Sequence, residues 1–404
     1  MNTTLKYIAK ADGPWGVLLV FLRLGVTSFG GPVAHLGYFR SEFVDRRKWL
    51  DETGYADIVA LCQFLPGPAS SQVAVTLGML RCGIIGGLAA WLGFTLPSAI
   101  ALICFGYGVA NLGDIGHVAW LHGLKIVAVA VVAQAVWGMA RNLCPDRERA
   151  TLAIAAAVLV LAIPSAGGQI GAIVAGAMIG WIALRSNAPL APAPLPLSLS
   201  RPLSVAALTL FFVLLFGLPY IAIQSHAHGL MLLARFYRAG ALVFGGGHVV
   251  LPLLQQAVVP SGLVDQDAFL AGYGAAQAVP GPLFTFAAYL GTIMLQQPRG
   301  WQGGLLCLAS IYLPSFFLLI GVLPFWETLR QRAGVQAALR GINATVVGLL
   351  LAALYNPVWT SAILSPSDFA IALAAFLLLT MWRVPPWLVV VLGAGAAQAI
   401  AFAA

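Results

Sequence analysis

The sequence predicts an all-α, polytopic membrane protein made of two inverted repeats. Three observations predict this fold: the composition, the length of the apolar segments and an internal match between the two halves of the chain. Hydrophobic residues make up 60% of the 404 residues and charged residues only 8%, whereas soluble domains contain roughly 25% charged residues. A chain of this composition is expected to have a lipid bilayer as its main solvent.

Several apolar segments reach the roughly 20 residues that a membrane-spanning helix needs. The formal charge of +8 is spread over short loops, without the basic run or aromatic-basic interleaving that nucleic acid requires. The five cysteines are scattered, without zinc-site or disulfide spacing. We therefore expect a bilayer partner and no nucleic acid, metal or cofactor. The predicted spans cover 84–108, 118–140, 203–222, 302–325, 335–355 and 386–403.

The two halves of the chain match each other in the same order. Residues 21–31 (FLRLGVTSFGG) and 236–246 (FYRAGALVFGG) are identical at six of eleven positions. Further along, Gln-x-x-Pro-Gly-Pro occurs at 63–68 and again at 277–282. A series of matches in one order indicates a structural repeat.

We expect an N-terminal membrane repeat over 1–185 and a C-terminal repeat over 229–404. Residues 186–228 join them as a Pro-rich linker followed by one extra transmembrane helix. If each repeat crosses the bilayer an even number of times, a single connecting helix turns the second repeat upside down. The sequence therefore predicts inverted topology.

The loop charges agree with inversion. In the first repeat, loop 141–149 carries three arginines and loop 111–117 carries no Lys or Arg. In the second repeat, the counterpart of 111–117 is 326–338, which carries two arginines, and the counterpart of 141–149 is 356–368, which carries none. Because cytoplasmic loops collect Lys and Arg, the equivalent loops of the two repeats are expected on opposite sides.

One basic loop, 40–52, does not fit this pattern if every apolar segment is a full span. Segments 14–38 and 54–80 are then better described as re-entrant hairpins, which return to the side they entered. The sequence leaves both descriptions open.

Glycine- and proline-rich motifs interrupt the apolar segments at matching places in the two repeats. Proline removes an amide donor, glycine allows close backbone approach, and a helix that restarts after a break presents unpaired N–H groups. We expect the helices to break there and to offer an oxyanion site, with simple close packing as the alternative. The motifs are Phe29-Gly30-Gly31-Pro32, Pro66-Gly67-Pro68, Phe244-Gly245-Gly246-Gly247 and Pro280-Gly281-Pro282.

Polar and basic residues close to these motifs complete a candidate substrate site. They include hydroxyl and amide side chains after each Pro-Gly-Pro, two repeated glutamines, and basic residues within apolar stretches, which could also reach the interface by snorkelling. We expect His35 and Asp57 as candidates to carry a coupling proton. The candidate substrate-binding residues are Arg23, Gly30, Gly31, Gln63, Pro66, Gly67, Pro68, Ser70, Ser71, Gln72, Lys125, Arg238, Gly245, Gly246, His248, Gln277, Pro280, Gly281, Pro282, Thr285 and Arg340.

Sequence motifs for ATP-driven pumping and for common hydrolytic chemistry are missing. The chain has no Gly-x4-Gly-Lys-Ser/Thr loop, no Gly-x-Ser-x-Gly and no His-Glu-x-x-His. Its few carboxylates are unclustered within the apolar segments, so we do not expect an enzyme.

These motifs, together with residues 39–49 (FRSEFVDRRKW), resemble those of the chromate ion transporter family, whose two-half members carry Phe-Gly-Gly and Pro-Gly-Pro in each half. The resemblance extends over nearly the whole chain. It implies a secondary transporter that exports chromate across the bacterial inner membrane and confers chromate resistance, with sulfate as a related dianion. The alternative is a sulfate or other oxyanion permease, or an anion channel, of the same architecture. A homodimer is a further expectation.

Overall fold

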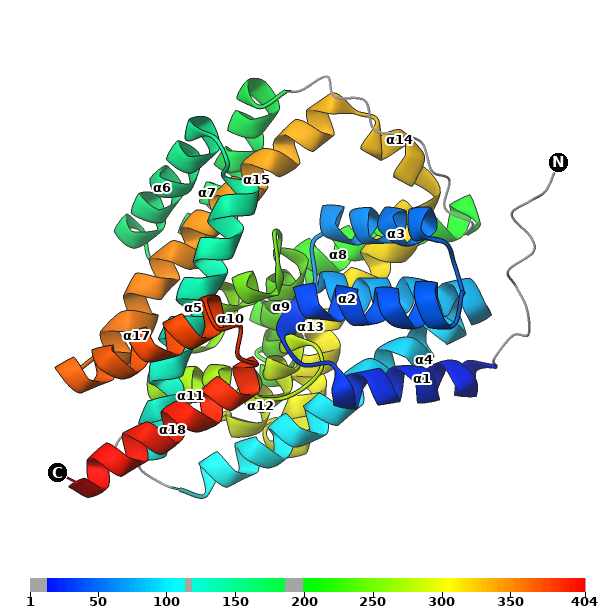
Figure 1. The fold of residues 1–404 in the computed structure, drawn as a ribbon. Coiled ribbons are helices and arrows are strands. Elements are labelled where there is room, and N and C mark those ends of the chain that lie inside the picture. Colours follow the sequence, from blue (N-terminus) through cyan, green and yellow to red (C-terminus); the bar gives the residue numbers. More distant parts are fainter. Residues whose placement is uncertain (1–12, 113–117, 186–198, 404) are drawn as a thin grey trace.

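The structure is a computed structural model that describes residues 13–112, 118–185 and 199–403. Within these ranges the chain forms helices and no strands (Figure 1). Residues 186–198, the Pro-rich part of the predicted linker, lie outside the described residues.

The helices of the two repeats follow one another in the same order. The first repeat contains α1 (Pro14–Thr27), α2 (Gly31–Arg40), η1 (Ser41–Arg46), α3 (Glu52–Phe64), α4 (Ala69–Ala110), α5 (Ala119–Leu143), α6 (Arg147–Ala162) and α7 (Ala166–Ala183). The connecting helix is α8 (Arg201–Ser225). The second repeat contains α9 (His228–Ala241), η3 (Gly247–Val249), α10 (Val250–Val258), α11 (Gln266–Ala276), η4 (Leu283–Thr285), α12 (Phe286–Ile293), α13 (Gly300–Val322), η5 (Leu323–Phe325), α14 (Trp326–Arg330), α15 (Ala333–Ala353), η6 (Leu354–Trp359), α16 (Thr360–Ala362), α17 (Pro366–Thr380) and α18 (Pro386–Ala403).

Six helical stretches of the described chain are long and apolar enough to cross a bilayer. Four of them contain the predicted spans that begin at 84, 203, 302 and 335, and a fifth, Ala119–Leu143, begins one residue after the predicted span 118–140. The sixth is α7, whereas the predicted span at 386–403 forms α18, a shorter apolar helix. The long stretches are Ala69–Ala110, Ala119–Leu143, Ala166–Ala183, Arg201–Ser225, Gly300–Arg330 and Ala333–Ala362.

All four predicted helix breaks are present. The Phe-Gly-Gly motifs separate α1 from α2 and α9 from α10, and the Pro-Gly-Pro motifs separate α3 from α4 and α11 from α12. Gly67 and Gly281 have φ values of 123° and 97°, which residues with a Cβ rarely adopt. The glycine in each Pro-Gly-Pro is therefore required by the backbone path.

The segments before the first two breaks are short. Helix α1 has 14 residues, which at about 1.5 Å per residue reach about 21 Å, less than the roughly 30 Å of a hydrocarbon core. Helix α4 has an additional kink at Cys82 and Gly83, whose backbone angles are non-helical. The short α1, the 13 residues of α3 and the kink close to residue 80 in α4 favour the re-entrant description of 14–38 and 54–80 over full spans.

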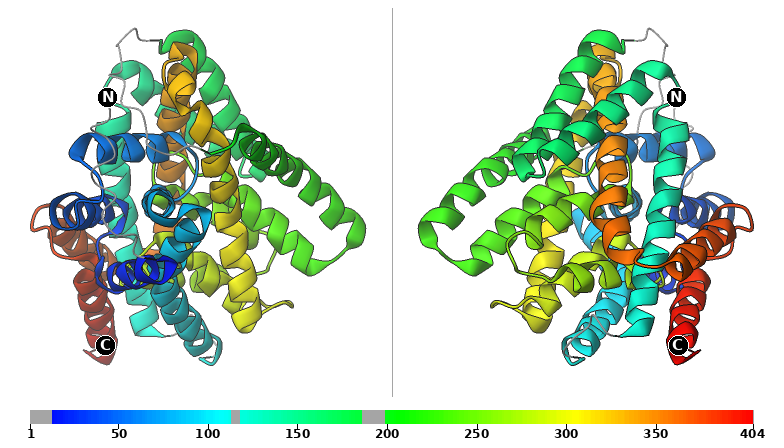
Figure 2. Two further views of the ribbon diagram at one scale, coloured as in Figure 1. Left: turned by 90° about the vertical axis from the view of Figure 1, so that its right-hand side faces the viewer. Right: turned by 90° about the vertical axis from the view of Figure 1, so that its left-hand side faces the viewer.

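The repeats run in opposite directions. In both figures α5 rises from the lower to the upper side of the molecule, whereas its counterpart α15 descends (Figures 1 and 2). The basic segments 141–149 and 326–338 consequently lie on the same, upper side. This is the arrangement that the inverted loop charges predict.

The repeats also exchange their last two helices. Helices α6 and α7 of the first repeat pack against α15, and α17 and α18 of the second repeat pack against α5 (Figure 1). Small residues make the close approach between α7 and α15: a side chain at Gly341 would collide with the carbonyl oxygen of Gly176, and one at Gly180 with the backbone of Ala337. In a bilayer such contacts, rather than a hydrophobic effect, hold helices together.

We predict that Gly176→Ala destabilises the protein because its methyl group would overlap Thr345 in α15. Overpacking of this kind costs about 1–3 kcal/mol. Gly171→Ala on the same helix is the matched control, since Gly171 is exposed and nothing lies within 4 Å of the added carbon. Thermal unfolding of both variants in detergent measures the difference. A midpoint for Gly176→Ala equal to or above that of Gly171→Ala would contradict the close helix contact.

Candidate functional site

The four helix breaks meet through two hydrogen bonds that cross between the repeats. The N–H of Gly67, in the first Pro-Gly-Pro, donates to the carbonyl oxygen of Val243 at 2.7 Å. The N–H of Gly281, in the second, donates to the carbonyl oxygen of Ser28 at 2.9 Å. Val243 and Ser28 are repeat counterparts, each one residue before a Phe-Gly-Gly. Reciprocal contacts between equivalent positions indicate a pseudo-two-fold axis through the crossing.

Serines behind the glycines strengthen this symmetry. A side chain at Gly67 would collide with Ser315 Oγ of α13, and one at Gly281 would come within 3.0 Å of Ser98 Oγ of α4. Both serines end a Leu-Pro-Ser sequence that occurs at 96–98 and again, in the same order of matches between the repeats, at 313–315. Each Pro-Gly-Pro therefore packs onto the long helix of the other repeat, and only glycine leaves room for the contact.

A cavity of about 50 Å³ lies on one side of the crossing. It is bounded by the first Phe-Gly-Gly break and by the second Pro-Gly-Pro break, and its lining is about equally polar and apolar. At about 10–15 Å³ for each water-sized sphere, it has room for several such groups. The lining residues predicted from the sequence are Gly30, Gly31, His248, Gln277 and Gly281.

Neutral groups provide the polarity of this cavity. His248 pairs through Nδ1 with the Tyr273 hydroxyl at 2.8 Å, and Gln277 lies beside it. Gln134 of α5 also lines the cavity and was missed from the sequence, although a glutamine within an apolar span is a usable signal. No Lys, Arg, Asp or Glu is among the described residues of the lining. The first turn of α2 at Gly31 adds backbone amides that lack intrahelical acceptors.

A second, smaller cavity of about 10 Å³ lies at the first Pro-Gly-Pro break, where α4 begins. It has room for about one water-sized group. Three polar atoms of its lining are buried and have no hydrogen-bond partner among the described residues, and buried polar groups normally have one. The site thus favours a polar ligand. These atoms are Gln72 Oε1, Trp91 Nε1 and Ser315 Oγ, and the paired hydroxyls of Ser71 and Tyr312 complete the polar lining.

Sequence reasoning identified Ser71 and Gln72 but missed Trp91, Tyr312 and Ser315. The repeated Leu-Pro-Ser sequence was a signal for Ser315, whereas the two aromatic residues are typical of any apolar helix. The corresponding space in the second repeat differs, because Thr285 Oγ1 donates to the Pro282 carbonyl at 2.7 Å and the buried Phe284 and Phe286 replace Ser70 and Gln72. The two breaks are therefore chemically unequal.

His35 connects α2 to the start of α4. It is fully buried, its Nδ1 lies 3.3 Å from Ser70 Oγ, and its ring packs edge-on against Phe94. A hydrogen bond between its ring and the Ser28 backbone ties it to the crossing. His35 therefore lies buried between the first Phe-Gly-Gly break and the start of α4.

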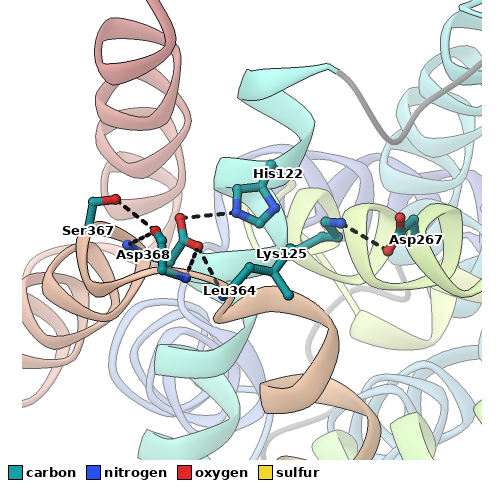
Figure 3. Close-up of polar contacts among 7 residues, drawn as sticks. His122, Lys125, Asp267, Leu364, Ser367 and Asp368 are labelled. Atoms are coloured by element: carbon teal, nitrogen blue, oxygen red, sulfur yellow. Dashed lines mark hydrogen bonds and ion pairs between the residues drawn. The ribbon is translucent and has the colours of Figure 1, made fainter. Parts of the chain in front are cut away.

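Two ion pairs join the repeats away from the cavities. Lys125 Nζ of α5 lies 2.9 Å from Asp267 of α11, while His122, one turn earlier, points toward Asp368 of α17 (Figure 3). Asp57 of α3 pairs with Arg330 of α14 at 2.5 Å, and both side chains are buried. These partners favour a structural role for Lys125 and Asp57. Arg330 is thus also a buried packing residue, not only a loop charge.

Several other candidates lie outside the two cavities. Arg23 and Gln63 are exposed, although Gln277, the counterpart of Gln63, lines the larger cavity. Gly245 faces Met139, Leu143 and Val346, which form an apolar wall. Two nitrogens of Arg340 are buried without a hydrogen-bond partner in the described part of the chain.

The remaining candidates shape the breaks or line another space. Pro66 accepts a hydrogen bond from Gln72 Nε2 at 2.8 Å, Pro68 caps α4, and Pro280 and Pro282 flank Gly281 in the turn before α12. Gly246 adopts a φ of 145° at the second Phe-Gly-Gly break. Arg238 lines a third cavity.

We predict that Arg330→Gln destabilises the protein strongly, because it leaves the Asp57 carboxylate buried without its counter-charge. Breaking one side of a buried ion pair costs about 3–5 kcal/mol. The double variant Asp57→Asn/Arg330→Gln should recover part of that loss. Unfolding midpoints of both single variants and the double variant give the coupling energy, and purely additive losses would argue against the pair.

Comparison with known proteins gives a consistent result. The family model described as "Chromate transporter" matches residues 15–181 and 230–399. An uncharacterized transporter of Methanocaldococcus jannaschii is 28% identical over 361 residues, covering 87% of each chain. The chromate transport protein of Pseudomonas aeruginosa is 27% identical over 332 residues, covering 82% of this chain and 77% of the relative.

The chromate transport protein of Cupriavidus metallidurans is 23% identical over 349 residues, covering 83% of this chain and 80% of the relative. No solved structure matches the chain. The two regions that the family model matches coincide with the two structural repeats, and each repeat carries a Phe-Gly-Gly and a Pro-Gly-Pro break. This multi-pass membrane protein therefore belongs to the chromate transporter family, whose members are transporters and not enzymes.

Proposed function

We propose that this protein is a secondary transporter that exports chromate from the cytoplasm across the bacterial inner membrane and so confers chromate resistance. The crossing of the four helix breaks is the observation that supports this most, because it brings the unpaired amides of α2 from the first repeat and His248 and Gln277 from the second to one polar cavity. The names of the Pseudomonas and Cupriavidus relatives support chromate as the anion.

In this mechanism the anion is held by dipoles and hydrogen bonds. The first turn of α2 lines the cavity with Gly31 and Pro32, which brings unpaired amides and the positive end of the helix dipole to it, and Gln277 and His248 add side-chain groups. Neutral donors hold a dianion less tightly than arginine would, which suits a site that must also release it. The second Pro-Gly-Pro backbone closes the cavity at Gly281.

Alternating access would come from rocking of one repeat against the other. Such a motion must alter the Gly67–Val243 and Gly281–Ser28 contacts, since these connect the repeats at the crossing. The two cavities lie at different breaks and would open in turn. His35 remains our candidate for the coupling proton because it is buried at the crossing, between Ser28 and the start of α4.

A sulfate or other oxyanion permease, or an anion channel, is the alternative function. It is favoured by the neutral lining of the cavity, which contains no group that separates chromate from sulfate, since both are tetrahedral dianions. Flux of labelled chromate and sulfate into reconstituted vesicles under imposed pH gradients separates these possibilities. Chromate flux that responds to the gradient supports a coupled transporter, and flux indifferent to it supports a channel.

We predict that Gly281→Ala lowers the chromate transport rate at least tenfold while the protein still folds. An alanine is strained at a φ of 97° and its methyl group crowds Ser98, so the crossing should be displaced. Gly217→Ala in α8 is the control, because nothing lies within 4 Å of the added carbon. Both rates are measured in proteoliposomes with equal amounts of folded protein. A transport rate for Gly281→Ala equal to that of the control would refute a role for the crossing.

We also predict that Gln277→Leu raises the KM for chromate more than Gln63→Leu does. The two glutamines are repeat counterparts, but only Gln277 lines the larger cavity and Gln63 is exposed. Losing a hydrogen bond to a charged ligand costs about 1.5–3 kcal/mol, which corresponds to a KM increase of at least about tenfold. Equal effects of the two substitutions would contradict the assignment of the substrate to this cavity.

A further inference from the structure

Helices α7, α9 and α10 enclose a third cavity, of about 20 Å³, away from the break crossing. We call it the α9 cavity. Its polar lining includes Gln169, Arg235 and Arg238, and most of the remaining wall is apolar. It has room for one or two water-sized groups. Both arginines are partly exposed, so a larger ligand can extend outward from it.

The charges of this cavity are not balanced. Arg235 donates from one nitrogen to the Ala257 carbonyl at 2.8 Å and to Ser261 Oγ at 2.6 Å. Arg238 has no hydrogen-bond or ion-pair partner among the described residues, and the described lining contains no Asp or Glu. Two guanidinium groups in a partly buried, mostly apolar cavity are costly unless an anion compensates them.

The start of α7 adds to the positive potential. Ala166, its first residue, lines the cavity, and the Ser165 side chain caps the amide of Gly168, which leaves the Ala166 amide without an intrahelical acceptor. The dipole of this 18-residue helix places its positive end there. The Gln169 amide donates to the Pro252 carbonyl and fixes α7 against α10.

These groups match a tetrahedral oxyanion. A guanidinium is a planar fork that can donate two parallel hydrogen bonds to two oxygens of one anion, and a helix N-terminus supplies further N–H donors. The first repeat does not reproduce the pair, because Val20 replaces Arg235 and Arg23, the counterpart of Arg238, is exposed. The site is therefore a feature of one repeat and not a by-product of the duplication.

We propose that the α9 cavity is a second oxyanion-binding site, with Arg238 and Arg235 as its counter-charge. Its ligand is either a free dianion such as sulfate or chromate, or the phosphate of a membrane lipid. The binding of an oxyanion in this cavity does not depend on the proposed function. Only the identification of a free dianion there as the transported substrate rests on it.

The test uses the purified full-length chain in detergent and the variant Arg238→Gln, which breaks no hydrogen bond in the described structure. Equilibrium dialysis with radiolabelled sulfate at constant ionic strength gives the number of bound anions and their Kd, and mass spectrometry gives the phospholipid that remains bound. Arg238→Lys keeps the charge but not the fork. Arg141→Gln removes an exposed charge at the end of α5 and serves as the control.

If sulfate is the ligand, Arg238→Gln should weaken one class of bound sulfate about tenfold or more, Arg238→Lys should weaken it less, and Arg141→Gln should leave it unchanged. If lipid phosphate is the ligand, Arg238→Gln should lose bound phospholipid while sulfate binding stays constant. Unchanged sulfate and phospholipid binding in folded Arg238→Gln would overturn the proposal. If the protein moves no chromate in vesicles, and Arg238→Gln nevertheless weakens sulfate binding, the proposed function is refuted while this binding site is supported.

Discussion

Backbone groups exposed at a helix break must find partners inside the protein, because a bilayer offers no water to satisfy them. Each repeat satisfies a carbonyl of its own Pro-Gly-Pro break, through Gln72 and Thr285. The glycine amides instead find their acceptors in the opposite repeat, since Gly67 donates to Val243 and Gly281 donates to Ser28. The remaining architecture, including the positions of α4 and α13 behind the two glycines, follows from holding these two contacts together.

The exchange of helices and charges extends this dependence beyond the crossing. Helix α7 packs on α15 through Gly176, Gly180 and Gly341, and Lys125 and Asp57 find their carboxylate and guanidinium partners in the second repeat. Because a bilayer gives apolar helices little reason to associate, backbone proximity and ion pairs must supply the specificity. The ion pairs join the repeats at places away from the cavities, where they can maintain contact during a rocking motion.

The two repeats have diverged where a ligand would bind. The larger cavity combines the first Phe-Gly-Gly with the second Pro-Gly-Pro and carries His248 and Gln277, whereas Gly245 at the opposite combination faces Met139 and other apolar side chains. Buried polar atoms gather beside the first Pro-Gly-Pro, and aromatic residues fill the equivalent space beside the second. A symmetric backbone thus supports two chemically different cavities, which is useful to a transporter that must present unequal states on its two sides.

The sequence by itself determined the membrane environment, the two repeats, their inversion and the positions of all four breaks. These are local properties: apolar length, loop charge and the backbone chemistry of glycine and proline act within a few residues of the chain. The tertiary structure decided which break meets which, that Gln277 lines a cavity while Gln63 is exposed, and that Lys125 and Asp57 are paired. Those outcomes depend on packing between residues more than a hundred positions apart, where side-chain volume and helix orientation choose the partner, and no periodicity within one helix contains that information.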